Sequence, residues 1–581
     1  MSKIHLAGQF LAKAKQMGDA PLFFDKIEGQ WQAVSYKEAA GRVGALANNL
    51  QKMGLRAGDR VILCAENSSS WAICDLAILA AGGIVVPAYT THTLRDHAHQ
   101  LADSGASFII CSDSKAGACL MAVAVQIQPT QPIKAAIIIP NPSKRAEKSL
   151  QDDNAPFPIL PVEEMWQPAQ EKFSCESGGQ ETCCIIYTSG TGGQPKGVML
   201  SHASIQANID AAFELLEEGQ AAKGAVFLSL LPLSHAYEHT AGLHLPAQIG
   251  AQIYYCEGSD KIAANLAEVR PTLMTAVPRL YEVLYDRITK GVEAKGGLSA
   301  KLFHKAVHLG CKRWRGEPLS LRERVLNRIL DKLVRKKVAM RFGGRLKYFV
   351  SGGAALNPEI GRFFLGLGVN ILQGYGQTEA SPLISANRPG DIRIETVGPR
   401  VSGVEVKCSR DGELLARGAC VMNGYWQNPK ATEETLRNGW LHTGDLAEIS
   451  EDGFITITGR KKDMIVNSGG DNIAPSRVEA EFLVQPEIAQ IMVAGDKRPW
   501  LAAVIVPTSE INALPEAEKL AQIKQAVSRA NSALAAFERV RKFILHEEEF
   551  TIENNQLTPT LKVRRHIVFS LYQDKLDALY R

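Results

Sequence analysis

The stretch at residues 185–201, IIYTSGTGGQPKGVMLS, constrains the fold and the function more than any other part of the chain. Two short apolar runs flank a polar loop, which is the pattern of a strand, a loop and a second strand. The loop combines glycines, hydroxyl side chains and one lysine. Glycines leave backbone N–H groups open to a ligand, and hydroxyls and an ammonium donate to phosphate oxygens. The sequence therefore predicts a phosphate-binding loop, with an ordinary hairpin loop as the alternative.

Two familiar nucleotide motifs are absent from the sequence. A Walker A loop needs Gly before its Lys and Ser or Thr after it, but Pro195 and Gly197 flank Lys196. The second glycine-rich segment, GYGQTE, has Glu379 where a dinucleotide fingerprint needs its last Gly. These departures disfavour a P-loop NTPase and a dinucleotide-binding fold.

The length and the pattern of elements predict more than one domain. A single hydrophobic core stops growing near about 250–300 residues, and the chain has 581. Helical and strand-like patterns alternate over residues 35–112, which predicts an α/β fold of layered sheets. We predict a large N-terminal domain over 1–461, with a small β-rich subdomain at 397–460, and a small mobile α+β C-terminal domain over 462–581.

Charge and cysteine usage exclude several protein classes. A formal net charge of +4 is too small to indicate a nucleic-acid partner. Residues 72–89 are the most apolar run, but Asp75 and Pro87 interrupt it, so we expect no membrane span. The N-terminus lacks the pattern of a signal peptide. Eleven cysteines without a CxxC pair predict reduced thiols and a cytoplasmic location.

Residues 287–347 form a basic, amphipathic insertion. Eighteen Lys or Arg residues stand there against four Asp or Glu residues, and leucine and isoleucine recur at helical spacing around residue 330. Two interpretations stay open. The insertion is either a solvated helical pair that covers the body, or a peripheral contact with the inner membrane surface.

Three further motifs carry chemistry. In GYGQTE, Tyr375 can stack on a purine and Glu379 can hold Mg²⁺. Asp445 and Arg460, fifteen residues apart, suit the hydroxyls of a ribose. Lys562, in LTPTLKVRR, would be an ordinary surface lysine if it stood alone.

Taken together and in this order, the four motifs resemble the adenylate-forming superfamily of acyl-CoA synthetases, peptide-synthetase adenylation domains and luciferases. The resemblance extends from about residue 10 to the end of the chain. The segments LPLSHAYEH, NGWLHTGDLAEISEDGFITITGRKKDMIV and NSGGDNIAP, with the basic insertion before SGGAAL, look most like bacterial long-chain fatty acid CoA ligases. The resemblance implies that ATP activates a medium- to long-chain fatty acid to acyl-AMP with release of pyrophosphate. CoA then takes the acyl group as a thioester, with ATP, Mg²⁺ and CoA as the cofactor and co-substrates.

The resemblance also assigns roles to residues of this chain. The β- and γ-phosphates of ATP would be held by Thr188, Ser189, Gly190, Thr191 and Lys196. The adenine would lie among Gly353, Ala354, Tyr375 and Gly376. The ribose would be bound by Asp445 and Arg460. The Mg²⁺ ion would be held by Glu379 and Thr191.

Catalytic roles follow from the same resemblance. Lys562 would contact the acyl carboxylate and the α-phosphate, and Thr378 would also contact the α-phosphate, beside Glu379. His235 would gate the acyl pocket, with a structural histidine as the alternative. The C-terminal domain would turn about Lys462 between the two half-reactions and bring Gly469 and Gly470 beside the thiol.

Other functions stay open at this level. The acyl group could pass to an acyl carrier protein instead of CoA. Alternatively, the protein could have no catalytic activity and act as an acyl-binding or scaffolding protein. A free amino acid is disfavoured, because LPLSHAYEH has no Asp to pair with its amino group. Eukaryotic long-chain ligases usually have DRKK where this chain has GRKK at 459–462, so acyl length cannot be transferred from them.

Overall fold

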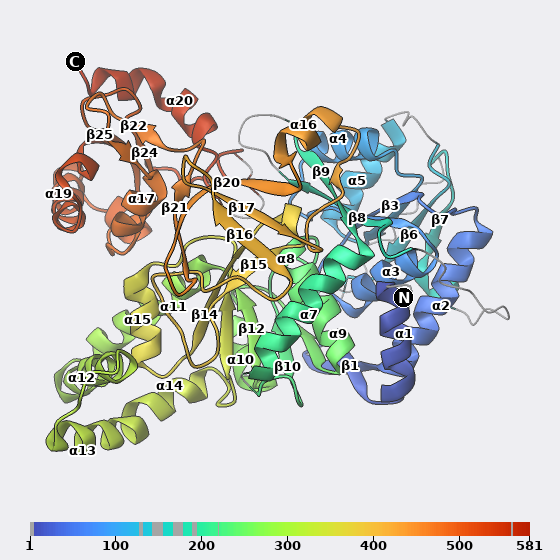
Figure 1. The fold of residues 1–581 in the computed structure, drawn as a ribbon, viewed down its shortest axis with the longest axis horizontal. Helices are drawn as coiled ribbons and strands as arrows, with labels where there is room; N and C mark the ends of the chain where they lie inside the picture. Colours follow the sequence, from blue (N-terminus) through green and yellow to red (C-terminus); the bar gives the residue numbers. More distant parts are fainter. Residues whose placement is uncertain are drawn as a thin grey trace.

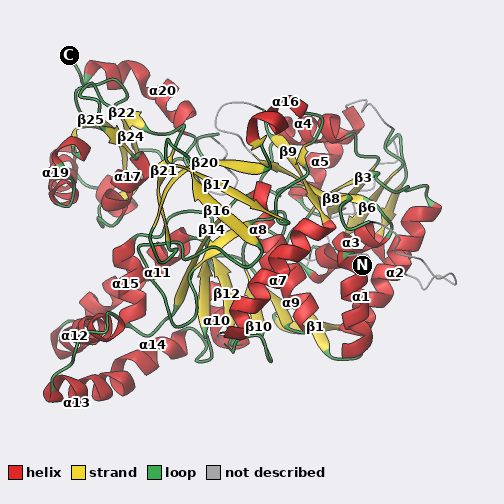
Figure 2. Cartoon of the chain, in the orientation of Figure 1, coloured by secondary structure: helices red, strands yellow, loops and turns green. Residues whose placement is uncertain are grey.

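The computed structural model describes residues 5–126, 132–141, 155–166, 178–188, 194–218, 220–552, 554–558 and 562–581. Three sheets form the body, and a smaller unit from the C-terminus lies at one side of it (Figure 1). Figure 2 shows the helices that cover these sheets. The layered α/β body with its β-rich part and its α+β C-terminal unit confirms the predicted fold class.

The first eight-stranded sheet carries the phosphate-loop hairpin. Its strand order is β18-β9-β8-β4-β3-β5-β6-β7. Its strands are β3 (Arg60–Cys64), β4 (Ile84–Pro87), β5 (Phe108–Ser112), β6 (Ala135–Ile139), β7 (Ile159–Pro161), β8 (Thr182–Thr188), β9 (Lys196–Ser201) and β18 (Gly424–Tyr425). Its helices are α2 (Tyr36–Lys52), α3 (Ser69–Ala80), α4 (Leu94–Ser104), α5 (Lys115–Gln126) and α6 (Val162–Met165). The predicted alternation of helix and parallel strand is confirmed over β3, β4 and β5.

The second eight-stranded sheet has the order β15-β14-β13-β12-β10-β11-β1-β2. Its strands are β1 (Pro21–Ile27), β2 (Gln30–Ser35), β10 (Val226–Ser229), β11 (Gln252–Tyr255), β12 (Leu273–Ala276), β13 (Tyr348–Ser351), β14 (Ile371–Gly376) and β15 (Leu383–Ala386). The N-terminal hairpin β1–β2 crosses into this sheet, where Phe23 pairs with Ile253. The N-terminal hairpin is thereby joined to the middle of the large unit.

Helix α3 lies between the two sheets and is buried along its whole length. A helix that is apolar on every side belongs in an interior, and SSWAICDLAILA is such a sequence. Helices α1 (Leu6–Met17) and α2 pack against it, and the π-helix η1 (His239–His244) contacts it through His239 and Asp75. The π-helix in turn contacts α7 (His202–Glu218), the short α8 (Ala236–Glu238) and α9 (Leu245–Ile249). Asp75 of α3 is consequently a carboxylate in the middle of the molecule.

The β-rich segment forms a five-stranded antiparallel sheet. Its elements are β16 (Val404–Cys408), β17 (Glu413–Gly418), β19 (Leu436–Arg437), β20 (Trp440–Ile449) and β21 (Ile455–Arg460), with α16 (Pro429–Thr435) beside them. The neighbouring helices on the second large sheet are α10 (Ile262–Val269), α15 (Pro358–Gly366) and the 3₁₀ turn η3 (Thr378–Ala380).

The C-terminal unit has hydrophobic clusters of its own. Its strands are β22 (Ile465–Val466), β23 (Asn472–Ile473), β24 (Ile488–Ala494), β25 (Leu501–Pro507) and β26 (Val540–Leu545). Its helices are α17 (Pro475–Leu483), α18 (Ser509–Asn512), α19 (Glu516–Ser532), η4 (Ala536–Glu538) and α20 (Arg565–Ala578).

The basic insertion is a helical arm that projects from the second large sheet (Figure 1). It consists of α11 (Pro278–Lys295), α12 (Gly297–Trp314), α13 (Leu321–Leu330), the π-helix η2 (Asp331–Arg335) and α14 (Lys336–Arg341). No helix in the described ranges combines the length and the apolar character needed to cross a bilayer.

Candidate active site

One large cleft, of 3060 Å³, opens between the body, the β-rich sheet and the C-terminal unit. It brings together residues from all four sequence motifs, although these lie up to 374 positions apart. The predicted site residues that line it are Thr188, Lys196, His235, Gly353, Ala354, Tyr375, Gly376, Thr378, Glu379, Asp445, Arg460, Lys462 and Lys562. Ser189, Gly190 and Thr191 lie outside the described residues, so their predicted roles remain predictions.

The hairpin β8–β9 reaches the cleft with the two residues that flank the predicted phosphate loop. Thr188 and Lys196 face each other as a register pair at the end of the hairpin. The Lys196 ammonium lies 4.8 Å from the centre of the Tyr425 ring, a cation–π distance. Because Lys196 ends on the cleft, its charge is available to a polyanion there.

Tyr425 is a site residue that the sequence did not indicate. It belongs to β18, which pairs with β9, and its hydroxyl donates to Glu379 Oε1 over 2.8 Å. Its ring thus meets Lys196 while its hydroxyl orients Glu379. A carboxylate held in this way beside Lys196 fits Mg²⁺, which takes oxygen ligands and keeps several waters.

The other end of the cleft suits a nucleoside. The Tyr375 hydroxyl donates to Asp445 Oδ2 over 2.7 Å, and Arg460 Nε lies 3.5 Å from Asp445 Oδ1. Burial raises the pKa of Asp445, and Arg460, Tyr375 and Lys562 oppose that rise. The carboxylate is therefore surrounded by donors and positioned to accept from the hydroxyls of a sugar.

Two glycines are required by the backbone around this end. Gly353 has φ +83°, in the left-handed region that favours glycine. A Cβ on Gly376 would stand 1.7 Å from the carbonyl oxygen of Pro382, so any side chain there would displace the neighbouring strand. Both positions keep the backbone close to the place where the adenine is expected.

Lys562 reaches the cleft from the C-terminal unit. Its loop is closed by Thr558, whose N–H donates to the Lys562 carbonyl over 2.8 Å and whose hydroxyl accepts from the Lys562 N–H over 3.0 Å. Burial and Arg460 lower the pKa of the Lys562 ammonium, while Asp445 works in the opposite direction. The side chain of Lys562 is exposed to solvent, but it lines the cleft and interacts with the charges of Arg460 and Asp445, unlike an isolated surface lysine.

His235 lies at the same end of the cleft as Lys562. Burial, assisted by the Lys562 charge, lowers the pKa of His235 to about 4, so the imidazole is neutral near pH 7. Its Nδ1 accepts from the Tyr237 N–H over 3.2 Å at the start of α8. His235 therefore has the local structural role of an N-cap while one side of it faces the cleft.

The predicted hinge residue lines the cleft, but the two glycines predicted to reach the thiol do not. Lys462 lies in the turn after β21, next to Lys461, whose ammonium pairs with Glu413 over 3.1 Å. Gly469 and Gly470 lie in the exposed turn between β22 and β23, where Asn467 accepts from the Gly469 N–H, and they do not line the cleft. This arrangement presents Lys562, and not the two glycines, to the cleft.

Apolar side chains line another part of the cleft. They come from α7, β10, η1, α9 and β12, and are Ala212, Leu215, Leu216, Phe227, Ala241, Leu245 and Leu273. A lining of this kind suits a hydrocarbon chain.

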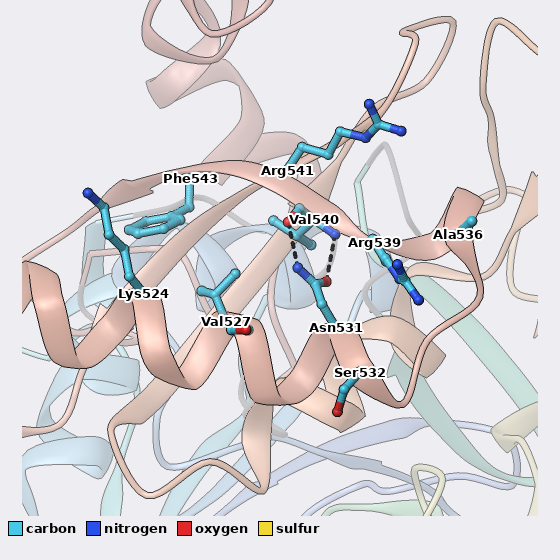
Figure 3. Close-up of a pocket in the computed structure, with 10 residues that line it drawn as sticks. Lys524, Val527, Asn531, Ser532, Ala536, Arg539, Val540, Arg541 and Phe543 are labelled. Carbon is cyan, nitrogen blue, oxygen red and sulfur yellow. Dashed lines mark hydrogen bonds between the residues drawn. The ribbon is translucent and has the colours of Figure 1, made fainter.

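A second depression, of 770 Å³, lies between α19 and β26 (Figure 3). Asn531 braces its wall by two hydrogen bonds to the backbone of Val540, at 2.9 and 3.0 Å. The ten residues that line it include no predicted site residue.

Comparison with known proteins agrees with this geometry. The AMP-binding enzyme family matches residues 10–426, and the AMP-binding enzyme C-terminal domain matches residues 462–581. Long-chain-fatty-acid–CoA ligase FadD15 of Mycobacterium bovis is 32% identical over 95% of this chain and 93% of its own. Long-chain-fatty-acid–CoA ligase ACSBG2 of Gallus gallus is 28% identical over 98% of this chain and 80% of its own.

Solved structures share the fold. The A domain of the carboxylic acid reductase from Segniliparus rugosus, in complex with AMP and a co-purified carboxylic acid, has a TM-score of 0.79 at 22% identity. It covers 99% of this chain and 94% of its own length. ATP-bound MatB from Rhodopseudomonas palustris has a TM-score of 0.70 at 22% identity, with 99% of each chain covered. On the extent of these matches and the motifs gathered in its cleft, the chain belongs to the family of AMP-binding, adenylate-forming enzymes.

Proposed function

We propose that this protein is a fatty acid–CoA ligase that activates a medium- to long-chain fatty acid with ATP and passes the acyl group to CoA. The single observation that supports it most is the meeting, in one cleft, of the phosphate hairpin, the nucleoside end, an apolar lining and Lys562. The curated relatives are named long-chain-fatty-acid–CoA ligases, which supports the same substrate class. Enzymes of this kind use ATP, Mg²⁺ and CoA.

The first half-reaction joins two anions. A carboxylate oxygen of the fatty acid attacks the α-phosphorus of ATP, the bond to the bridging oxygen breaks, and pyrophosphate leaves with that electron pair. Lys562 and Thr378 offset the repulsion between the carboxylate and the α-phosphate and hold the two in line. Mg²⁺ bound at Glu379 would supply further positive charge to the phosphates.

The second half-reaction forms the thioester. The sulfur of CoA attacks the acyl carbonyl carbon, and AMP leaves as the C–O bond to the phosphate breaks. Lys562 lines the cleft in this structure, whereas Gly469 and Gly470 do not. We propose that the unit 462–581 turns about Lys462 relative to 1–461 and brings the two glycines to the thiol.

Substitution of Lys562 tests this assignment. We expect Lys562→Ala to lower the rate of pyrophosphate release with fatty acids by about 10²–10³, because a donor acting mainly in the transition state is lost. Thioester synthesis from supplied acyl-adenylate and CoA should stay close to wild type. The measurements are pyrophosphate release across acids of graded length and, separately, thioester formation from the adenylate.

Lys524→Ala is the matched control, since Lys524 is an exposed lysine of the same unit at the second depression. It should leave both half-reactions unchanged. Equal loss of both half-reactions in Lys562→Ala would remove the role assigned to Lys562. Wild-type protein that releases no pyrophosphate with any fatty acid would remove the proposed function.

The acceptor is tested in the same assay. Thioester and AMP formed with free CoA support the ligase, whereas product formed only on a phosphopantetheinylated acyl carrier protein supports the alternative acceptor. A catalytically silent scaffold is disfavoured, because Lys562 and Glu379 both line the cleft.

We also propose that the helical arm makes a peripheral contact with anionic membrane lipid. Four apolar side chains at intervals of four residues run along α13 and η2 on the outside, with exposed fractions of 79%, 59%, 47% and 48%: Leu321, Val325, Ile329 and Leu333. Exposed cations flank them, namely Arg322, Arg324, Arg328, Lys332 and Lys336. The inner face of the arm packs separately through Ala306, Leu309 and Leu330. A stripe of apolar residues between cations suits the interface of an anionic bilayer.

Vesicle binding tests the membrane contact. We expect the wild type to bind vesicles of phosphatidylglycerol and phosphatidylcholine, more weakly as salt rises, and the double variant Leu321→Ser, Ile329→Ser to bind at least about tenfold less. Leu571→Ser on α20 is the control, because Leu571 is 60% exposed but lies on the C-terminal unit. Absent or salt-insensitive binding would leave the arm as a solvated cover of the body.

A further inference from the structure

A buried cluster of three ionisable side chains lies outside the catalytic groups. Asp75 of α3 and His239 and His244 of η1 are 0%, 1% and 2% exposed. The His239 Nε2 nitrogen lies 2.9 Å from Asp75 Oδ1, a hydrogen bond. The His244 Nε2 nitrogen lies 3.4 Å from Asp75 Oδ2, an ion-pair distance. One carboxylate thus faces two imidazoles, one with each oxygen.

The π-helix explains why the two histidines converge. In an α-helix, residues five positions apart point about 140° away from each other. The wider π turn, with hydrogen bonds from i to i+5, brings positions 239 and 244 onto one face, and their ring centres lie 4.6 Å apart. Such turns are rare and are found mostly at functional sites.

The rest of η1 and the residue that follows it contribute to the cleft. Thr240, Ala241 and Leu245 line it, the last two as part of the apolar lining. The Thr240 hydroxyl also donates to the carbonyl of Ser381 over 3.1 Å, directly after the turn that carries Thr378 and Glu379. The orientation of η1 therefore sets both the wall of the apolar lining and one support of the catalytic turn.

The cluster has the composition of a metal site, but its geometry fits a carboxylate held between two imidazoles better. Within the described ranges it is the one group of three His, Cys, Asp or Glu ligand atoms that lie within 4.8 Å of one another. Zinc, however, usually takes four ligands at one centre about 2.0–2.2 Å from each. Here the two carboxylate oxygens face different imidazoles, at 2.9 Å from His239 Nε2 and 3.4 Å from His244 Nε2, so the three groups do not converge on one central point.

We propose that Asp75, His239 and His244 are positioning residues, a buried carboxylate–imidazole triad that clamps η1 onto α3 and fixes the wall against which the acyl chain binds. The role in acyl binding rests on the proposed function. The attachment of η1 to α3 does not depend on that function. The triad touches no reacting atom and acts through Thr240, Ala241 and Leu245.

Kinetics of three variants test the role in acyl binding. Asp75→Asn and His244→Ala should raise the KM for long-chain acids by about tenfold or more and shift the preferred acyl length, with the KM for ATP changed less than about twofold. His244→Gln, which keeps a donor near the Nε2 position, should recover most of the wild-type KM. An equal rise in the KM values for acid and ATP would overturn the proposal.

Asp25→Asn is the matched control. Asp25 is also a buried carboxylate bound to α3, where it accepts from the Ser69 N–H over 3.0 Å at the other end of the helix. Because it does not contact η1, its loss should leave the profile of acyl lengths unchanged. If Asp25→Asn shifted the preferred acyl length as far as Asp75→Asn does, the shift would reflect a general disturbance of α3 and not the triad.

Two measurements on the wild-type protein need no substrate and no stable variant. Amide hydrogen exchange should be as slow over residues 239–245 as over α3; fast exchange confined to η1 would contradict a clamp. Elemental analysis of protein purified without chelator should find no stoichiometric transition metal, and one Zn²⁺ per chain would replace the carboxylate–imidazole triad by a metal site. Both results stand even if no fatty acid proves to be a substrate.

Discussion

Glu238 is a carboxyl group with no solvent exposure, one position before the π-helix. The Ser229 and Thr275 hydroxyls each donate to one of its oxygens over 2.6 Å. Burial raises the pKa of Glu238 to about 7, and the two hydroxyls only partly oppose this. The folded state therefore binds this proton more tightly than the unfolded chain, whose carboxyl titrates near 4.5.

A stability measurement against pH tests this residue. Because the pKa is higher in the folded state, its contribution to stability is present at pH 4 and is lost as pH rises through 4.5 to 7. Glu238→Gln should remove that loss and raise the free energy of unfolding at pH 8 by up to about 3 kcal/mol. Calorimetric Tm values at pH 5 and pH 8 give the comparison. Glu293→Gln, at an exposed position of α11, should keep the wild-type slope, and an unchanged slope in Glu238→Gln would refute the assignment.

At the residue scale, the sequence predicted which residues bind the nucleotide better than it predicted the contacts among those residues. The pairing of Asp445 with Arg460 could be predicted because the two residues lie on neighbouring strands, fifteen residues apart, and both suit a ribose. The link from Lys196 through Tyr425 to Glu379 could not be predicted, since it depends on the antiparallel pairing of β18 with β9. Tyr425 stands in a segment without any motif, so only the tertiary fold gives it a role.

At the element scale, two helices meet at glycines. A Cβ on Gly310 of α12 would stand 1.9 Å from the carbonyl oxygen of Gly366 in α15, so the helices are in backbone contact. This contact joins the projecting arm to the second large sheet. We expect Gly310→Ala to destabilise the protein by about 1–3 kcal/mol, because the backbones must separate.

Gly291 of α11 offers a matched comparison, since nothing lies within 4 Å of a Cβ placed there. Gly291→Ala should be neutral or stabilising by about 0.5–1 kcal/mol, because alanine favours the helix. Thermal unfolding of the two variants, followed at equal protein concentration, checks the difference in sign. If Gly310→Ala raised the Tm as Gly291→Ala does, the helices would not be in contact at this point.

Helices and strands with strong local signals were predictable from the sequence. Ser35 and Glu38 indicated the start of α2, and the Ser35 side chain indeed accepts from the Glu38 N–H. The π-helices η1 and η2 were not predictable from the sequence, because a hydrophobic pattern indicates a helix through the 3.6-residue repeat of an α-helix. Five-residue spacing of His239 and His244 was the available signal, and it has meaning only once the wider turn is known.

At the scale of the whole molecule, alternating patterns predicted the α/β layers and the separate C-terminal unit. They could not predict that β1 joins the second sheet, because strand order across such a distance depends on packing and leaves no local trace. Nor could they predict that Lys562, far along the chain, would stand beside His235. The motifs indicated a common site, and the two large sheets with α3 between them position it.

The pairing of β1 with β11 has a consequence for biosynthesis. Phe23 leaves the ribosome long before Ile253, and at about 5–20 residues per second this delay lasts roughly tens of seconds. During that interval the apolar strand β1, PLFFDKI, is paired with β2 at most and lacks its partner β11. Its free edge is then exposed to aggregation or to chaperones. Strand β1 of this enzyme thus completes its sheet only after roughly 230 further residues (253 minus 23) have been made.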